Sequence, residues 1–284
     1  MASEINYAEK YSDLIDEKFS TASYTDGAIN PEYDFDGVNT VKIYSTDTVS
    51  LNDYNLSAPA NRYGQPNELG NAIQELKLTQ DKSFTFTIDR RNYDDTMMAN
   101  SAGAALNRQI NQIIIPTIDK YRIGVMVTKA GTKLEQTITE NNAYHSFLDA
   151  STSLVDKLIP IEGRSAFVTP DFYKKIKKDG NFTGRGDAAN DLARKGVVGE
   201  IDGTPIILVP TAYFPKGVNF IIVHNSAMVS PVKLSEYKTH DDPPGLNGWL
   251  VEGRVYYDAF VLTNKASGIL VSVDPTASTS PVTE

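Results

Sequence analysis

The side chains best suited to acid–base or metal chemistry are three histidines, which stand far apart at His145, His224 and His240. None has a second histidine or a glutamate at the spacing that places zinc ligands on one face of a helix. His145 falls off the apolar face of an expected helix, which predicts a solvated position. His224 ends an apolar strand, where a hydrogen-bonded boundary residue is a simpler interpretation than a general base. The histidines therefore indicate no catalytic or metal-binding site.

Two pairs of adjacent acidic residues occur, Asp94–Asp95 and Asp241–Asp242. Glycosidase-type catalysis needs two carboxylates that face each other across several ångströms, which sequence neighbours do not ensure. The first pair suits a helix start, where negative charge is favoured, and the second precedes a Pro-Pro-Gly turn. The string Gly184-Arg185-Gly186 lacks the lysine, the hydroxyl residue and the preceding strand of a phosphate loop. We therefore predict no catalytic residue, no cofactor and no metal site.

Composition excludes further classes of chemistry. The 284 residues include no cysteine, which removes disulfides, thiolate metal ligands and thiol nucleophiles. With 27 basic and 36 acidic side chains the formal net charge is −9, whereas nucleic-acid binding normally needs a basic surface. The lysine run at 174–178 lies between Asp171 and Asp179 and predicts a solvated helix face. The 15 tyrosines lie outside any basic groove, so packing explains them better than base stacking.

The first third of the chain holds little that could form a core. Residues 1–37 are polar, with a short amphipathic helix expected at 11–19, and we expect them to form an arm that folds against a neighbouring molecule. Strand-like residues at Val38–Val49 and an alternating strand at Ser83–Ile88 flank a long polar stretch, Ser50–Glu68. Two strands around a polar tip predict a long projecting hairpin. No signal sequence opens the chain and no apolar run approaches the ~18 residues of a membrane span, so we expect a soluble, cytoplasmic product.

Two helices are expected in the middle of the chain. The first runs from Asp94 to Ile115, and Pro116 should kink or end it. Its apolar residues recur at helical spacing and should form one inward stripe: Met98, Ala102, Leu106, Ile110 and Ile113. The second should begin near Thr137, which has capping-box spacing to Glu140, and should close at Pro160. The inward face of the second helix should consist of Ala143, Phe147, Ser151, Leu154 and Leu158.

After residue 160 the pattern changes to short elements. A helix is expected at 170–178, a flexible loop at 181–190 and a mobile tail at 274–284. Strands are expected at 166–168, 197–201, 205–209, 218–223, 251–262 and 268–273. Asp202-Gly203 is a hairpin turn signal between two of these strands. The organisation is α+β without an internal repeat, and the final strands should return to the earlier part of the chain.

Several strings along the chain identify a family. They are the alternating Phe84–Asp89, the helix after Asp94, the Pro-x-x-Asp-x-Tyr set of Pro116, Asp119 and Tyr121, Gly163-Arg164 followed by Phe167-Val168 and by Pro170 to Tyr173, and the stretches 196–206 and 251–261. Their order and spacing cover essentially the whole chain. With them the sequence resembles the major capsid proteins of tailed phages (Caudoviricetes), which have the Hong Kong 97-like fold.

The resemblance implies an α+β, Hong Kong 97-like capsid fold with six parts. These are an N-terminal arm (1–37), an extended hairpin loop or E-loop (38–92), a spine helix with part of the peripheral domain (93–119), a mainly axial domain (120–245), returning strands of the peripheral domain (246–273) and a flexible tail (274–284). The implied function is structural and not enzymatic. Subunits would assemble as hexamers and pentamers into an icosahedral head around double-stranded DNA, held without sequence-specific contacts.

The resemblance also implies partners and a location. The protein would belong to the virion, with assembly in the host bacterial cytoplasm, no membrane and a portal protein as a further partner. The family's type member carries a cleaved scaffolding segment before its arm, whereas this arm starts almost at Met1, so we expect a separate scaffolding protein and no large cleavage. Its isopeptide cross-linking set could not be matched here. Two alternatives stay open, an encapsulin-type bacterial nanocompartment shell and, more remotely, an α+β enzyme or ligand-binding protein.

Overall fold

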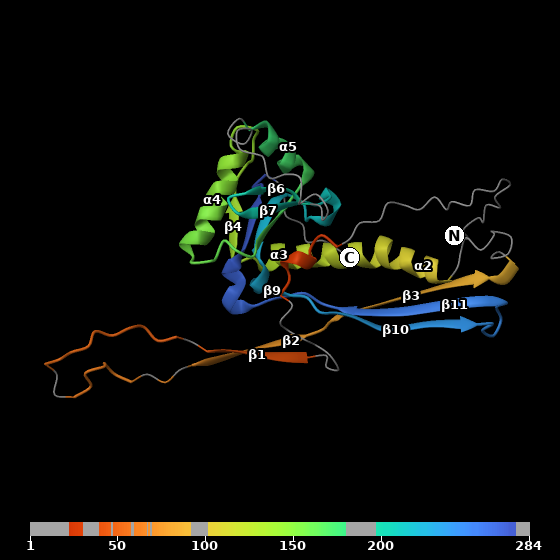
Figure 1. Ribbon diagram of the computed structural model, residues 1–284, viewed down its shortest axis with the longest axis horizontal. Helices are drawn as coiled ribbons and strands as arrows, with labels where there is room; N and C mark the ends of the chain where they lie inside the picture. Colours follow the sequence, from red (N-terminus) through yellow and green to blue (C-terminus); the bar gives the residue numbers. More distant parts are fainter. Residues whose placement is uncertain are drawn as a thin grey trace.

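The computed structural model describes residues 23–30, 40–46, 48–57, 60–66, 68, 70–91, 102–179 and 197–276. Figure 1 shows a compact lobe of helices around a sheet, a long helix lying along a second sheet, and a narrow hairpin that projects away from both. The helix expected at 11–19, the Asp94–Asp95 pair, the loop at 181–190 and the tail beyond 276 lie outside the described residues. No helix among the described residues has both the length and the apolar character of a membrane span.

The lobe is built on a six-stranded sheet with the order β4-β13-β8-β5-β7-β6. Its strands are β4 (Thr132–Glu135), β5 (Arg164–Val168), β6 (Val197–Ile201), β7 (Thr204–Leu208), β8 (Val218–His224) and β13 (Ile269–Val273). The interior strands β5 and β13 are buried along their whole length, as expected of strands that are covered on both faces. Asp202 and Gly203 have positive φ angles of 52° and 72°, as a two-residue hairpin turn requires. The predicted β6–β7 hairpin is confirmed.

Helix α4 (Ala143–Asp156) has Asn142 as its N-cap and begins five residues later than its capping-box spacing predicts. The reason is Asn142, whose side chain accepts a hydrogen bond from the Thr139 amide at 2.7 Å and donates one to the Thr137 carbonyl at 3.1 Å. These bonds hold 137–142 in a turn. Leu158, expected on the inward face, is 92% exposed because the chain leaves the helix there with φ 60°. The other predicted inward residues are buried: Ala143, Phe147, Ser151 and Leu154.

The long helix does not end at Pro116. It consists of α2 (Ala102–Gln109), a π-helical turn η2 (Ile110–Ile114) and α3 (Ile115–Lys129), and at 1.5 Å per residue it is about 40 Å long. In the π turn the Ile115 amide donates to the Ile110 carbonyl, so Pro116 falls in the first turn of α3, where a missing amide hydrogen does little harm. The Thr117 hydroxyl donates to the Ile113 carbonyl at 2.6 Å. Of the two outcomes expected at Pro116, a kink or an end, the end is wrong, and a π-helical turn lies just before the proline.

The apolar stripe predicted for the first half of this helix is only partly buried. Leu106 and Ile110 are half-buried, and Ile113 is 54% exposed. The fully buried apolar residues lie instead in α3 and are Ile118, Ile123, Met126 and Val127. Among the described residues, the first half of the helix, where the apolar spacing is most regular, is therefore less buried by its own subunit than α3 is.

The lobe buries an apolar core on each face of its sheet. On one face, α4 and α5 (Pro170–Lys178) enclose a cluster that includes Phe147, Leu154, Phe172, Ile176, Phe220 and Ile222. On the other face, α3 packs with the sheet around Ile123, Met126, Phe167, Ile221, Val223 and Val271. Helix α5 matches its prediction, with Thr169 as N-cap accepting from the Phe172 amide at 3.3 Å. The lobe is thus a three-layered α+β unit.

The second sheet has three antiparallel strands in the order β10-β11-β3, namely β3 (Gln80–Asp89), β10 (Val232–Asp241) and β11 (Gly248–Tyr257). The alternation at 83–88 is confirmed, since Phe84 packs with Ile118 and Val255 beneath the long helix. Its partner is β11, however, and not the strand near residue 40. Of the final strands, only β11 returns to this sheet, whereas β13 joins the sheet of the lobe. Strands β4 and β10 were not predicted.

The projecting hairpin consists of β1 (Thr40–Thr46) and β2 (Asn71–Lys77), which pair along their whole length. The prediction of a long hairpin is confirmed, but its second strand lies earlier than expected. Short elements complete the fold: strands β9 (Met228–Val229) and β12 (Phe260–Val261), and 3₁₀ turns η1 (Asp26–Ala28), η4 (Thr211–Tyr213), η5 (Asn225–Ala227) and η6 (Thr263–Gly268).

Candidate functional site

The three histidines do not come together: His145 lies on α4, His224 at the end of β8 and His240 on β10. His145 is exposed on α4, and the ring of half-buried His224 accepts a hydrogen bond from the Ser226 amide at 3.2 Å. Burial lowers the pKa of His224. His240 is exposed beside Glu252, with a nitrogen–oxygen distance of 3.3 Å. Among the described residues no group of histidines and carboxylates could hold a metal ion. The predictions of a solvated His145 and a hydrogen-bonded His224 are confirmed.

The other charged strings that we considered are surface features. Asp241 and Asp242 both pair with Arg90, at 3.1 and 3.0 Å, and all three side chains are exposed. In the lysine run, Lys175 pairs with Asp171 at 2.7 Å, and Lys174, Lys177 and Lys178 are exposed. The predicted solvated face is confirmed for these residues. Asp179 departs from it, because its carboxylate is buried and accepts from the Tyr144 amide at 3.1 Å.

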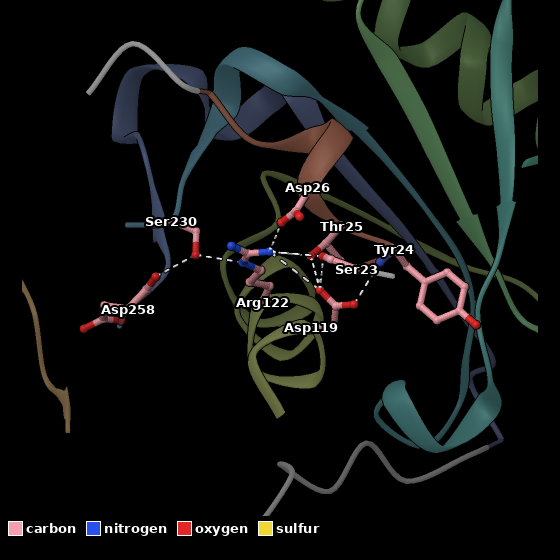
Figure 2. Close-up of polar contacts among 8 residues, drawn as sticks. All are labelled: Ser23, Tyr24, Thr25, Asp26, Asp119, Arg122, Ser230 and Asp258. Atoms are coloured by element: carbon pink, nitrogen blue, oxygen red, sulfur yellow. Dashed lines mark hydrogen bonds and ion pairs between the residues drawn. The ribbon is translucent and has the colours of Figure 1, made fainter. Parts of the chain in front are cut away.

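A buried polar network joins residues 23–30, called the arm segment below, to α3. Figure 2 shows Asp119 and Arg122 pointing from one face of the helix toward this segment. Asp119 is 1% exposed, and its carboxylate accepts from the Ser23 hydroxyl at 2.7 Å, the Tyr24 amide at 2.9 Å and the Thr25 hydroxyl at 2.5 Å. Three donors on one carboxylate fix the segment in a single register.

Arg122 extends the network in two directions. Its Nη1 donates to the Thr25 hydroxyl at 3.0 Å and to the Asp26 carboxylate at 2.7 Å, while its Nε donates to the Ser230 hydroxyl at 2.9 Å. The Arg122 side chain is 6% exposed, and the Asp119 carboxylate lies 3.6 Å from its Nη1. A buried guanidinium needs this number of partners, because each unsatisfied donor would carry a desolvation cost.

The same network continues to Asp258, in the turn between β11 and β12. The Ser230 hydroxyl donates to the Asp258 carbonyl at 2.7 Å, as Figure 2 shows. The Asp258 carboxylate accepts from the Thr79 amide and hydroxyl, both at 2.8 Å, and from the Tyr121 hydroxyl at 2.9 Å. Burial and this bond to Asp258 raise the pKa of Tyr121 to about 12. Thr79 lies between β2 and β3, where the projecting hairpin leaves the body.

The arm segment packs on its own subunit. Besides the polar bonds, Ala28 is fully buried in the lobe core, and the Asn30 amide donates to the Met228 carbonyl at 2.8 Å. The expectation that the arm folds against a neighbour is therefore wrong for residues 23–30. The reason is that Asp119 and Arg122 offer it buried, charged partners on α3, which the polar composition of the arm did not reveal.

The root of the hairpin, residues 74–79, is fixed by a second set of contacts. The Gln74 amide group donates to the Val261 carbonyl at 3.0 Å and accepts from the Thr263 amide at 2.9 Å. Leu76 and Leu78 are 1% exposed and pack with residues of β9 and the β12 turn. A single side-chain amide thus supplies both halves of a strand-like pairing, and the hairpin leaves the body at a defined angle.

Beyond the root, the hairpin is exposed, and several large apolar side chains stand out from its mostly polar sequence. Its exposed large side chains are Tyr44, Val49, Leu51, Tyr54, Leu56, Tyr63 and Ile73. The tip has internal order, since the Asn55 amide donates to the Arg62 carbonyl at 3.0 Å and the Tyr54 and Tyr63 rings meet edge to face at 4.9 Å. An ordered, exposed apolar element of this size is typical of an interface. The geometry of the described residues indicates assembly, and none of their side-chain groups is arranged for catalysis.

Sequence reasoning found part of the network without recognising its role. Pro116, Asp119 and Tyr121 carried the family pattern, and each has a distinct role in the structure. Pro116 fits the passage through the π turn, Asp119 anchors the arm segment, and Tyr121 supports Asp258. Arg122 and Ser230 were missed. The signal available for Arg122 was its position three residues after Asp119 on one helix face; nothing marked Ser230.

Comparisons with known proteins agree on one fold. A family model described as phage capsid protein matches residues 73–272. A solved structure from Mycobacterium phage Che8 is 19% identical, with 95% of this chain and 98% of that chain covered at a TM-score of 0.72. The mature capsid of bacteriophage PhiM1 is 11% identical, with 95% and 93% covered at 0.71. A virus-like particle from Pyrococcus furiosus is 10% identical, with 82% and 86% covered at 0.51. No individually curated protein matches.

Proposed function

The chain belongs to the phage capsid protein family, and from this premise we propose how its subunits build a phage head. It is a major capsid protein with the Hong Kong 97-like fold, a structural component of the virion and not an enzyme. We propose that its copies form hexamers and pentamers that tile an icosahedral shell around double-stranded DNA. The enzyme alternative is set aside by the family match, and so is the encapsulin-type alternative.

The projecting hairpin is the observation that carries this proposal. Among the described residues, seven of the twelve exposed large apolar side chains lie on it, between Tyr44 and Ile73. Their burial stabilises a structure by ~25 cal/mol per Å², but only another molecule can cover a hairpin that points away from its own body (Figure 1). When identical subunits repeat around a symmetry axis, each hairpin can be covered by the next subunit, and the ring of contacts closes.

The parts of the subunit receive roles in this proposal. The lobe with the six-stranded sheet is the axial domain, and the long helix with the three-stranded sheet is the peripheral domain. Residues 1–37 form the arm and 38–92 contain the E-loop, while the spine helix extends to Lys129 in α3. Strand β13 (269–273) belongs to the axial sheet, and 274–284 form the tail.

Partners outside the shell are part of the proposal. The net charge of −9 supports packaged DNA that is enclosed without sequence-specific contacts. We also expect a separate scaffolding protein and a portal protein. The intact mass of the subunit in purified heads tests the scaffold assignment: an unshortened chain agrees with it, and loss of tens of residues contradicts it.

Deletion of residues 55–66 tests the role of the hairpin. The variant should fold, because these residues lie beyond the anchored root, yet electron microscopy should show no closed shells. The matched control is Leu158→Ser, which removes an exposed apolar side chain (92% exposed) outside the hairpin and should leave shells intact. Normal shells from the deletion variant would overturn the assignment.

A further inference from the structure

We infer that Arg122 and Ser230 are positioning residues that couple the arm segment to the root of the projecting hairpin, so that the two parts loosen or tighten together. The coupling is a property of the single subunit. Its use in assembly, where hairpin and arm would have to reach their positions in concert, rests on the proposed function.

The arm end of the connection is charged and buried. Thr25 is fully buried, and its hydroxyl lies between Asp119 at 2.5 Å and Arg122 at 3.0 Å. The three shortest hydrogen bonds that Arg122 donates go to Asp26, Ser230 and Thr25. If the arm segment leaves, the bonds to Asp26 and Thr25 are lost. With the arm segment in place the Arg122 side chain is 6% exposed, so these two acceptors compensate much of its desolvation, and their loss removes contacts that hold the guanidinium in position.

The hairpin end depends on the placement of Asp258. Its carboxylate receives both the amide and the hydroxyl of Thr79, and it is 3% exposed. Its carbonyl receives the Ser230 hydroxyl, and that same hydroxyl accepts from Arg122. A shift of Arg122 therefore removes a hydrogen-bond donor from the Ser230 hydroxyl. The Ser230 hydroxyl in turn holds the backbone of Asp258, whose carboxylate accepts from Thr79.

The linker segment, residues 228–230, provides a second connection between the arm segment and the hairpin root, in addition to the Ser230 hydroxyl. The Met228 carbonyl accepts from the Asn30 amide of the arm segment at 2.8 Å. The next residue, Val229, is 1% exposed and packs with Leu76 and Leu78 of the hairpin root. Three consecutive residues thus contact the arm on one side and the hairpin root on the other, which gives the coupling a physical path.

Hydrogen exchange of the full chain, compared in one oligomeric state, tests the inference, since the Thr79 amide itself donates to Asp258. Thr25→Val should raise exchange at Thr79 by about fivefold or more, the lower end of typical site-to-site coupling. In the reciprocal experiment Thr79→Ala, which keeps its amide but loses its hydroxyl, should raise exchange at the Tyr24 and Asn30 amides. Reciprocity is required of any equilibrium coupling.

Ser230→Ala separates coupling from general destabilisation. In this background Thr25→Val should change exchange at Thr79 much less, because the bridging hydroxyl is gone and only the contacts of Met228 and Val229 still connect the two parts. Thr169→Ala, which removes the N-cap of the distant helix α5, is the control and should leave Thr79 unchanged. No effect of Thr25→Val on Thr79, or an equal effect with and without the Ser230 hydroxyl, would overturn the inference. Failure of the wild-type chain to form shells would instead contradict the proposed function and leave this readout intact.

Discussion

Asp119 and Arg122, one turn apart on α3, bind the same hydroxyl group. The Thr25 hydroxyl donates its proton to the Asp119 carboxylate at 2.5 Å and accepts a hydrogen bond from the Arg122 guanidinium at 3.0 Å. Only a group that both donates and accepts can bind a carboxylate, which accepts, and a guanidinium, which donates, at the same time. The arm segment is therefore held by the chemistry of one buried residue as well as by its packing.

Thr25→Val should destabilise the subunit by about 2 kcal/mol, because an isosteric methyl group leaves two buried charged groups each short of one partner. The free energy of unfolding from urea denaturation measures this loss. Thr25→Ser keeps the hydroxyl and should recover most of the stability. Equal stability of the valine variant and the wild type would show that the shared hydroxyl has no energetic weight.

Arg164→Met should cost about 3 kcal/mol, because it removes a buried, charged donor that binds three backbone carbonyl groups. The Arg164 side chain is 2% exposed and donates to the carbonyls of Pro160 at 2.8 Å, Ile159 at 2.6 Å and Ser151 at 3.2 Å. These carbonyls belong to α4 and the turn after it, and methionine offers them no hydrogen. A thermal melt should show a clear drop in the midpoint.

The matched control for Arg164 is Arg254→Met. Arg254 pairs with Asp81 on the exposed face of the three-stranded sheet, and exposed pairs contribute only ~0–1 kcal/mol. Its melting midpoint should stay close to that of the wild type. Similar losses for both arginines would contradict the distinction between a buried and an exposed guanidinium.

Gln74→Glu should loosen the hairpin root. The carboxylate still accepts from the Thr263 amide but has no proton for the Val261 carbonyl, so one bond is replaced by repulsion between two oxygens. Amide exchange in β2 should rise several-fold. Glu75→Gln, a neutralising change at an exposed neighbour on the same strand, is the control. Unchanged exchange in the Gln74 variant would show that apolar packing alone fixes the root.

Acidification should destabilise the subunit through His224. Burial lowers the pKa of His224 below its ordinary value of 6.5. As the pH falls from 7.5 through 6.5, the unfolded chain therefore binds a proton before the folded chain does, and stability declines. Urea midpoints measured between pH 7.5 and 5.5 should show this slope. In His224→Asn, which retains an acceptor for the Ser226 amide, the slope should flatten; an identical slope would assign the effect to other groups.

Much of the fold could be predicted from periodicity, and the failures have physical causes. The alternation of apolar and polar residues predicted β3, and the turn residues Asp202-Gly203 predicted the β6–β7 hairpin, because both signals are local. Strand β2 was missed since its residues are mostly polar and, among those whose burial is described, only Leu76 is buried. The helix continues past Pro116 because a π turn, which no pattern in the sequence indicates, places this proline where a missing amide hydrogen is tolerated.

The candidate site was less predictable than the fold. It joins residues about 100 positions apart, such as Thr25 with Arg122 and Arg122 with Ser230, and no periodicity connects them. Asp119 and Tyr121 were visible through the family pattern, but their partners were not. Polar composition predicted that the arm forms no core of its own, yet for residues 23–30 it could not distinguish a neighbouring subunit from α3 of the same chain.

Light scattering of the purified full chain, alone and mixed with the expected scaffolding protein, tests most directly whether this chain is a self-assembling shell subunit. We expect capsomers or aggregated subunits that convert to closed particles in the megadalton range. A protein that stays a stable monomer under all of these conditions would contradict this assignment.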